Sequence, residues 1–465
     1  MADSSVVVIG AGPAGLAAAY ELARHGISPV VLEKTSHIGG IARTEVYRGY
    51  RFDMGGHRFF TKIQEIENLW LEMLGEDLLQ VPRQSRIYYH DRFFHYPLEP
   101  LDTLRNLGPA ESLRILMSYI KVRLRPHRDE DTFEGWVINR FGARLYETFF
   151  RPYTEKVWGV PCASIQADWA AQRIRNLSLT TAVSNALLGT NHARSLIGEF
   201  YYPTLGPGMM WQRFQEAVER GGGQVCRQAG VVRLRLKGSR VVSVVARRDG
   251  QLDNMPIQHL ISTMPLPELI FRLDPLPPEP VLRAAKALRY RSFILVSLIV
   301  DQADLFPDNW IYVHEPRVRV GRIQNFKNWS AAMVPDPATT SLGLEYFCTE
   351  GDDLWSMPDA ALIKLAVREL ADLGLAGGGR VLDGVVFRQP KAYPLYDRDY
   401  RQAVALIRDF VATLENVQTI GRNGMHRYNN LDHSMLAGLL AARNLLGQAH
   451  DLWSLDDEGA YLEER

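Results

Sequence analysis

A glycine fingerprint near the start of the chain constrains the fold more than any other feature. An apolar run (6–9) precedes the pattern Gly10-x-Gly12-x-x-Gly15, and a helical stretch (16–25) follows it. Gly10 permits a tight turn out of the strand, Gly12 lets a pyrophosphate approach the backbone, and Gly15 lets the helix pack closely on the sheet. The free N–H groups at the helix start attract phosphate. This segment therefore predicts a strand–helix unit that binds a dinucleotide.

A second apolar run (29–32) completes the unit and ends at Glu33. A carboxylate about 20 residues after the first glycine can accept a hydrogen bond from a ribose hydroxyl. Pro13 and Ala14 lie in the phosphate turn, and Lys34 follows the acid. We expect all four of these residues at the dinucleotide.

Two further glycine pairs follow, in EKTSHIGGIART (33–44) and FDMGGH (52–57). Both segments resemble signatures of the superfamily that contains flavin amine oxidases, protoporphyrinogen oxidases, phytoene desaturases and UDP-galactopyranose mutases. The resemblance implies non-covalent FAD, with the first pair at the pyrophosphate and the second beside the isoalloxazine. The residues that it places there are Gly40, Arg43, Gly55, Gly56 and His57. A histidine beside apolar neighbours is equally well explained as a packed side chain.

The chain returns to the cofactor near its end. Residues 419–447 have the pattern of a strand, a loop and an apolar helix, for which Asp432 or Ser434 is a plausible N-cap. Such a helix would direct its N-terminus at the flavin. The family pattern also brings the backbone of Val232 to the adenine. The further expected FAD contacts are Val232, Gly421, Arg422, Asp432, Ser434 and Met435.

These patterns predict a mixed α/β (α+β) fold with three parts. They are a discontinuous Rossmann-like FAD-binding domain, a helical lobe and an antiparallel β-sheet substrate domain. The FAD-binding domain is expected at 1–84, 203–270 and 385–450, the helical lobe at 98–200, and the sheet domain at 85–97 and 271–384.

Composition excludes several classes of protein. The 465 residues carry no net charge, so nothing indicates a nucleic-acid partner. The three widely spaced cysteines do not suggest a disulfide framework or a metal site. This pattern is typical of a reducing compartment and favours a cytoplasmic location. No apolar run reaches membrane-spanning length. The stretch 105–128 is rich in Arg and Lys, with Leu113, Leu116, Ile120 and Leu124 on one face; a solvated helical face is expected there over peripheral membrane contact.

Three short stretches resemble the UDP-galactopyranose mutase branch of the superfamily, namely YTEKVWG (153–159), LRYRS (288–292) and GRNGMHRY (421–428). The resemblance implies that Tyr153 stacks on a nucleotide base and that Trp158 lies in the active-site cleft. It places Arg291 and Tyr428 on a substrate diphosphate and Arg422 beside the flavin. The second diphosphate arginine of the mutases falls near Leu177, so Arg175 or Arg173 would have to replace it. A tyrosine expected just before Arg322 is also missing, although Arg322 itself remains a candidate substrate ligand.

The resemblance implies a flavoenzyme that interconverts the pyranose and furanose forms of a nucleotide sugar through a reduced-flavin N5 sugar adduct. The candidate catalytic residues are His57, Arg291, Arg422 and Tyr428. The flavin must first be reduced, for which NAD(P)H is the candidate donor, and a homo-oligomer is compatible with the sequence.

The alternative is an FAD-dependent oxidoreductase of the protoporphyrinogen oxidase or amine oxidase type, which takes a hydride from a small molecule. Lys156 or Lys327 would then position a water molecule at the flavin. Its apolar pocket would be lined by Trp310, Tyr312, Phe326 and Trp329.

Overall fold

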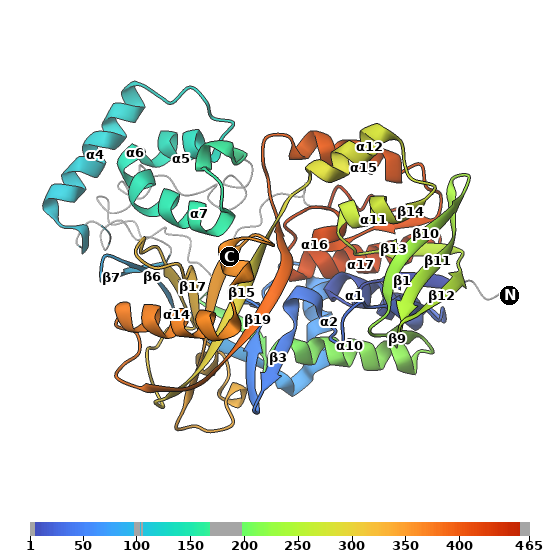
Figure 1. The fold of residues 1–465 in the computed structure, drawn as a ribbon, viewed down its shortest axis with the longest axis horizontal. Coiled ribbons are helices and arrows are strands. Elements are labelled where there is room, and N and C mark those ends of the chain that lie inside the picture. Colours follow the sequence, from blue (N-terminus) through green and yellow to red (C-terminus); the bar gives the residue numbers. More distant parts are fainter. Residues whose placement is uncertain (1–4, 97–102, 104–105, 168–197, 456–465) are drawn as a thin grey trace.

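The computed structural model describes residues 5–96, 103, 106–167 and 198–455. A five-stranded parallel sheet forms the centre of the FAD-binding region on the right of Figure 1. Its strand order is β20 (Val417–Thr419), β13 (His259–Ser262), β1 (Val6–Ile9), β2 (Val30–Leu32) and β9 (Gln224–Cys226). β1, α1 (Pro13–Arg24) and β2 match the predicted strand–helix–strand unit closely.

Alternate residues of β1 enter two different cores, because successive side chains of a strand point to opposite faces. Val6 and Val8 pack against α1, α2 (Gln64–Leu74), α10 (Gly208–Arg220) and α17 (Leu431–Leu445). Val7 and Ile9 pack on the other face. That face is covered by a four-stranded sheet of β12 (Gln251–Pro256), β11 (Arg240–Arg248), β10 (Gly230–Lys237) and β14 (Leu273–Asp274), and by α11 (Leu266–Arg272), α12 (Glu279–Ala287) and α15 (Tyr400–Val411).

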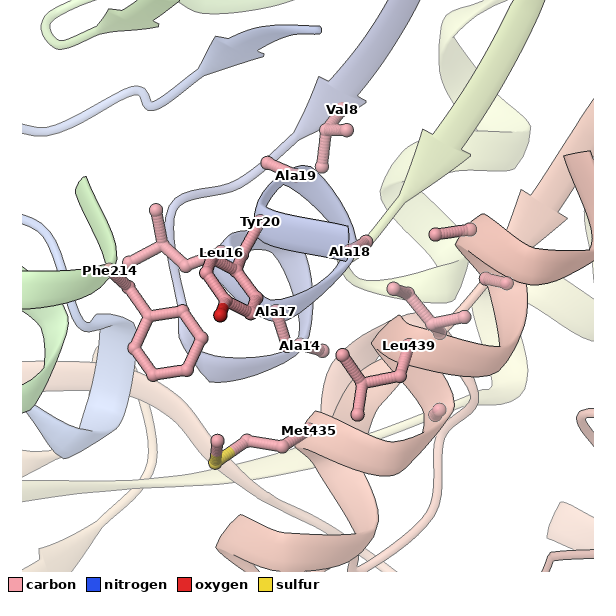
Figure 2. Packing of buried hydrophobic residues seen from close by; sticks show 14 of the residues in the cluster. Val8, Ala14, Leu16, Ala17, Ala18, Ala19, Tyr20, Phe214, Met435 and Leu439 are labelled. Carbon is pink, nitrogen blue, oxygen red and sulfur yellow. The ribbon is translucent and has the colours of Figure 1, made fainter. Parts of the chain in front are cut away.

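The helix that carries the phosphate turn is buried between two other helices. Figure 2 shows α1 between Phe214 of α10 and Met435 and Leu439 of α17. A Cβ added to Gly438 of α17 would lie only 2.2 Å from the carbonyl oxygen of Ala14. Two helices separated by more than 400 residues of sequence therefore pack backbone against backbone at the N-terminal end of α1.

A seven-stranded sheet forms the second layer. Its order is β19 (Arg380–Pro394), β15 (Tyr290–Asp301), β18 (Thr340–Cys348), β17 (Arg322–Asn325), β16 (Trp310–Val313), β6 (Ser85–Tyr89) and β7 (Arg92–His95). All neighbours are antiparallel except β16 and β6. One face packs on α14 (Asp359–Asp372) and α13 (Asp353–Ser356). The other packs on β3 (Thr44–Tyr47), β4 (Tyr50–Asp53), β5 (Leu78–Pro82) and β8 (Glu199–Pro203).

The helical lobe occupies the upper left of Figure 1. It contains α4 (Pro109–Leu124), α5 (Phe133–Phe141), α6 (Ala143–Leu145), a π-helical turn (Tyr146–Phe150) and α7 (Arg151–Trp158). Its core includes Ile87 and Phe94 of the β6–β7 hairpin, so the lobe packs on the end of the seven-stranded sheet. α7 faces the inside of the molecule and α4 lies at the outer edge.

The structure shifts two predicted boundaries. Residues 385–394 continue β19 in the seven-stranded sheet instead of entering the FAD-binding region, because β19 pairs with β15 along its length. Residues 273–287 join the FAD-binding region, where β14 pairs with β10. α2 ends at Leu74, because Gly75 adopts a positive φ of 52° and β5 follows. Among the described residues, no helix is long and apolar enough to cross a membrane.

Candidate active site

The turn between β1 and α1 is open to a phosphate group. Gly10 has a φ of +96°, and a Cβ there would lie 2.1 Å from Thr263 Oγ1. A Cβ on Gly15 would lie 1.9 Å from the Gly10 carbonyl oxygen. Gly12 is the N-cap of α1 and supplies no side-chain cap, while Pro13 occupies the first turn. The first N–H groups of the helix therefore remain available for an anion.

Glu33 is fixed at the end of β2. Its Oε2 accepts a hydrogen bond from the N–H of Ala11 at 3.0 Å, and its Oε1 accepts from the N–H and Oγ1 of Thr35 at 2.9 Å each. The side chain is buried. The carboxylate thus borders the phosphate turn, as a ribose contact requires, and Lys34 follows it near Gly230 of β10.

A second backbone loop faces the first. The N–H of Gly39 donates to the carbonyl of Ala11 at 2.8 Å. A Cβ on Gly40 would lie 3.2 Å from the Gly12 Cα, so no side chain stands between the two loops. This backbone cradle, which a Cβ would fill, fits the pyrophosphate of a dinucleotide.

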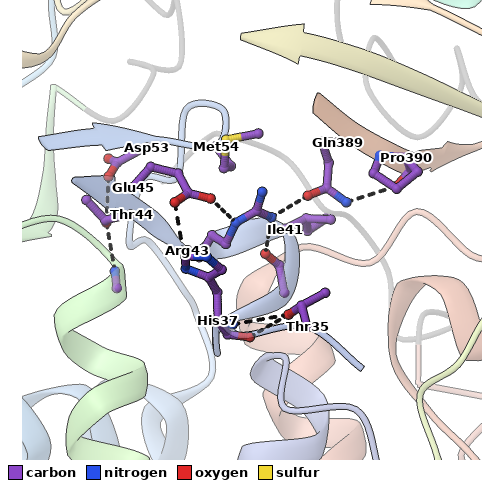
Figure 3. Close-up of polar contacts among 12 residues, drawn as sticks. Thr35, His37, Ile41, Arg43, Thr44, Glu45, Asp53, Met54, Gln389 and Pro390 are labelled. Atoms are coloured by element: carbon purple, nitrogen blue, oxygen red, sulfur yellow. Dashed lines mark hydrogen bonds and ion pairs between the residues drawn. The ribbon is translucent and has the colours of Figure 1, made fainter. Parts of the chain in front are cut away.

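Arg43 anchors this second loop, as Figure 3 shows. Its Nη1 donates to the carbonyl of Gly40 at 2.9 Å and to Oε1 of Gln389 on β19, and its Nε donates to Glu45. The guanidinium lies beside the cradle, where sequence placed a cation. It also joins the FAD-binding region to the seven-stranded sheet.

The C-terminal segment returns to the same place. A Cβ on Gly421 would lie 2.9 Å from the Cβ of Ala14. α17 begins after Asn430, which has an extended conformation and makes no side-chain cap. The prediction of Asp432 or Ser434 as the N-cap is wrong, because both lie within the first turn and the Asp432 carboxylate accepts from the N–H of His433.

Two other expected FAD contacts have distinct surroundings. Met435 is fully buried and its sulfur accepts from Nε1 of Trp70 at 3.3 Å, so its side chain belongs to the core. Val232 is the extra residue of a β-bulge in the pairing of β10 with β11. A bulge leaves its backbone groups out of the ladder, which suits an adenine contact through the backbone.

His57 ties the third glycine loop to the second. Its Nε2 lies 2.7 Å from the carbonyl oxygen of Ile41 and 2.9 Å from that of Met54. Burial, together with the charges of Arg422 and Arg322, lowers the pKa of His57 to about 4, against an opposing effect of the hydrogen bonds to the backbone of Met54 and Ile41. The imidazole is therefore neutral near pH 7 and donates from Nε2 to the backbone.

Gly55 and Gly56 bring this loop against the seven-stranded sheet. Gly55 has a φ of +97°, and its Cβ position lies 3.8 Å from Nη2 of Arg322. The Cβ position of Gly56 lies 3.6 Å from Oε1 of Gln324. Side chains of β17 thus border the loop expected at the isoalloxazine.

A buried charged cluster lies at this border. Arg322 donates to Glu345 from Nε at 3.0 Å and from Nη2 at 2.5 Å, and Gln324 Nε2 donates to the same carboxylate. Although burial alone would lower it, Glu345 raises the pKa of Arg322 well above its usual range. Gln324 Oε1 is buried and has no hydrogen-bond partner among the described residues.

An aromatic wall adjoins the cluster. The rings of Tyr393 and Tyr428 stack with centroids 5.7 Å apart and planes 9° apart. The Arg422 guanidinium lies 4.4 Å from the Tyr428 centroid, while its nitrogens donate to the carbonyls of Asn429 and Ala392. Buried Trp158 meets the Tyr393 ring edge-on at 6.2 Å.

Tyr153 projects from α7 into the same region. Its ring stacks on His314 with centroids 4.5 Å apart and planes 10° apart, and it meets Tyr312 edge-on at 5.7 Å. Burial raises the pKa of Tyr153 well above its usual range, against an opposing contribution from the Arg322 charge. Tyr153 and Arg322 therefore lie within electrostatic range of one another.

Arg291 is held by neutral groups, unlike Arg322, which is paired with a carboxylate. Its Nε donates to the carbonyl of Val157 at 3.1 Å and its Nη1 to Oγ1 of Thr349 at 2.6 Å. A Cβ on Gly159 would lie 2.5 Å from the Arg291 Cζ. These contacts hold the end of α7 on the seven-stranded sheet. The other candidate diphosphate arginine, Arg175, lies outside the described residues.

Both lysines considered for oxidase chemistry are held by backbone carbonyls. Lys156 Nζ donates to Val313, Glu315 and Val320 at 2.9 to 3.1 Å. Lys327 Nζ donates to Ala303, Pro337 and Thr339 at 2.6 to 3.1 Å. Because an ammonium group has three N–H donors, the three carbonyls occupy all the donors of each lysine. Trp310, Phe326 and Trp329 are likewise buried in the core.

Sequence reasoning missed Glu345, Gln324, His314 and Tyr393. Glu345 left a signal, because it is a charged residue inside the apolar strand LGLEYFC (342–348). The other three gave none, since their positions depend on strand pairing.

Comparison with known proteins agrees with this geometry. The family model of flavin containing amine oxidoreductases matches residues 13–415. The chain belongs to the flavin-containing amine oxidoreductase family. Enzymes of this family depend on flavin, in agreement with the backbone cradle described above.

Individual relatives differ in what they catalyse. A probable UDP-galactopyranose mutase of Klebsiella pneumoniae is 25% identical over 178 residues, 36% of this chain and 44% of that protein. The matches to curated relatives span less than half of those proteins. The crystal structure of a reduced UDP-galactopyranose mutase superposes with a TM-score of 0.85 at 21% identity, covering 99% of this chain and 97% of that one. A putative protoporphyrinogen oxidase from Exiguobacterium sp. 255-15 gives 0.72 at 16% identity, covering 96% and 100%. At such identities these likenesses concern the fold.

Proposed function

We propose that this flavoenzyme is a sugar-nucleotide mutase, which interconverts the pyranose and furanose forms of a nucleotide sugar on reduced FAD. The observation that carries the proposal is the positive charge on the flavin side of the site. The Cβ position of Gly55 lies 3.8 Å from Nη2 of Arg322 and 3.6 Å from Nε2 of His57, and the charge of Arg422 also lowers the pKa of His57.

The balance of charge favours an anionic ligand. Glu345 neutralises Arg322, whereas the hydrogen bonds of Arg422 go to the neutral carbonyls of Asn429 and Ala392. A net positive site attracts a diphosphate and repels the ammonium group of an amine substrate. A guanidinium also suits the bidentate geometry of phosphate oxygens.

Aromatic residues supply the remaining recognition. We assign the nucleotide base to Tyr153, whose ring is already oriented by His314 and Tyr312. We assign the diphosphate to Arg322, which adjoins the Gly55–Gly56 loop, and to Arg422 and Tyr428, whose guanidinium and ring lie 4.4 Å apart. Arg291 then acts by holding α7, and with it Tyr153, on the sheet.

These positions give the cofactor and the protein side chains different roles in the proposed reaction. When bound, reduced FAD supplies the nucleophile for the sugar, with no net oxidation. The arginines hold the departing diphosphate close to the sugar, which favours its return to the isomerised ring. His57 donates a hydrogen bond that fixes the loop. Because its imidazole is neutral near pH 7, it adds no charge to the site.

Ligand titration of the FAD-loaded protein tests this proposal. We would follow the flavin absorbance while adding UDP, GDP, dTDP or putrescine, with wild type, Arg422→Met and the exposed control Arg319→Met. We expect a nucleotide diphosphate to bind, Arg422→Met to weaken it by about tenfold or more, and Arg319→Met to leave it unchanged. Tighter binding of putrescine than of every nucleotide would refute the mutase assignment and favour an amine oxidase.

A further inference from the structure

Helix α4 carries an apolar stripe on its solvent face. The stripe, which we call the α4 stripe, consists of Leu113, Leu116, Met117, Ile120 and Leu124. Each of these side chains is between 46% and 78% exposed. At 100° per residue the five positions fall within a sector of about 100°.

The opposite face of α4 is the one that holds the helix in place. Ile115 and Tyr119 are buried against the lobe, and Glu111 forms ion pairs with Arg144 and Arg114. The helix therefore has two apolar faces, of which the outer one is not needed for packing. Such an exposed apolar patch commonly marks an interaction site.

Basic residues border the stripe on both sides. On the helical wheel Arg114 and Lys121 lie on one side and Arg123 lies on the other, and all three are exposed. The chain adds exposed Arg125 directly after the helix. The single acidic residue of α4, Glu111, is on the inward half and is occupied by arginines.

We propose that the α4 stripe docks the protein on the surface of an anionic lipid bilayer. Apolar side chains at the centre would enter the acyl boundary, while the flanking lysine and arginines reach the acidic headgroups. α4 lies at the outer edge of the molecule, away from the FAD-binding sheet, so it can lie flat on a surface without obstruction from that region. This docking is independent of the reaction proposed above.

Charge decides between a bilayer and a second copy of the chain. If two α4 stripes packed together, Lys121 and Arg123 of one copy would lie beside the same cations of the other. Like charges so placed are destabilising, whereas acidic headgroups complement them. The bilayer is therefore the favoured occupant, and self-association is the outcome that would replace it.

Vesicle flotation with the full-length FAD-loaded protein tests the proposal. Phosphatidylcholine vesicles with and without phosphatidylglycerol would be compared for wild type, Met117→Glu and Leu124→Glu. Leu252→Glu on β12 is the matched control, because Leu252 is 63% exposed and Met117 is 62% exposed. Since all three side chains are exposed, flavin absorbance and melting temperature should be unchanged.

We expect wild type and Leu252→Glu to float with phosphatidylglycerol vesicles. Met117→Glu or Leu124→Glu should lower the partition coefficient by about tenfold or more, because each removes an apolar anchor and adds a negative charge. The double variant Lys121→Glu/Arg123→Glu should abolish the preference for acidic lipid. Absence of wild-type flotation, or equal flotation of the stripe variants, would overturn the proposal. A dimer by light scattering that Leu124→Glu dissociates, with no vesicle binding, would assign the stripe to self-association.

Discussion

Arg322 and Glu345 are direct cross-strand partners on β17 and β18, and their side chains form a bidentate ion pair with Nε–Oε1 at 3.0 Å. The Glu345 side chain is fully buried and that of Arg322 is 17% exposed. The pair places a guanidinium at the Gly55–Gly56 loop, and it makes the stability of the sheet depend on a component of the site.

Removal of one partner of this ion pair should lower the stability of the fold substantially. Glu345→Gln leaves the Arg322 charge buried without its counter-charge, so the free energy of unfolding should fall by about 3–5 kcal/mol. The exposed pair of Arg319 and Asp353 is the control, where Asp353→Asn should cost at most about 1 kcal/mol. Urea unfolding measures both. Equal small losses would show that Arg322 is solvated and not held by Glu345.

The neutral state of His57 makes the protein sensitive to acid. Its folded pKa of about 4 lies below the unfolded value near 6.5, so its contribution is present above pH 6.5 and is lost as pH falls towards 4. The loss is roughly 1.4 kcal/mol per pH unit within that window. His57→Gln keeps a donor for Ile41 and Met54 but cannot titrate, so its stability should fall less between pH 6.5 and 4.5. Identical slopes for the two proteins in urea unfolding would contradict the depressed pKa.

Tyr153 should act through its ring. Tyr153→Phe keeps the stacking surface and should bind UDP with almost wild-type affinity. Tyr153→Ala removes that surface and should weaken binding by about 1–3 kcal/mol, the usual contribution of one stacked base. Flavin-monitored titration gives both constants. Unchanged affinity in the alanine variant would place the base elsewhere.

Lys156 should matter for folding and not for flavin chemistry. Lys156→Met leaves three buried carbonyls without a donor, and we expect the free energy of unfolding to drop by about 3 kcal/mol. The FAD content and the rate of flavin reduction by dithionite should not change. Lys364→Met, on the exposed side of α14, is the control for stability. A specific loss of flavin reoxidation by oxygen in Lys156→Met would instead support the oxidase alternative.

Local patterns predicted the dinucleotide-binding unit well. The glycines that open α1 act within a few residues of one another, so their spacing carries the geometry. The turn of the β6–β7 hairpin is local in the same sense, since its residues His90 and Asp91 both have positive φ.

Predictions that depend on tertiary packing were less accurate. An exception is the solvated helical face expected within 105–128, where Leu113, Leu116, Ile120 and Leu124 are all exposed. The placement of Arg291 on the diphosphate stays a prediction, and the position of Arg322 beside the Gly55–Gly56 loop depends on strand pairing. The length of β19 likewise depends on its pairing with a strand about 90 residues away.

Isomer turnover tests the central claim most directly. The FAD-loaded protein would be reduced anaerobically with dithionite, or with NADPH in a parallel sample, and mixed with a panel of UDP-, GDP- and dTDP-sugars whose products are separated by chromatography. We expect a new ring isomer of one sugar nucleotide with reduced flavin and none with oxidised flavin. No isomer from any sugar nucleotide, together with reduction of oxidised flavin by a small-molecule hydride donor, would contradict it and establish an oxidoreductase.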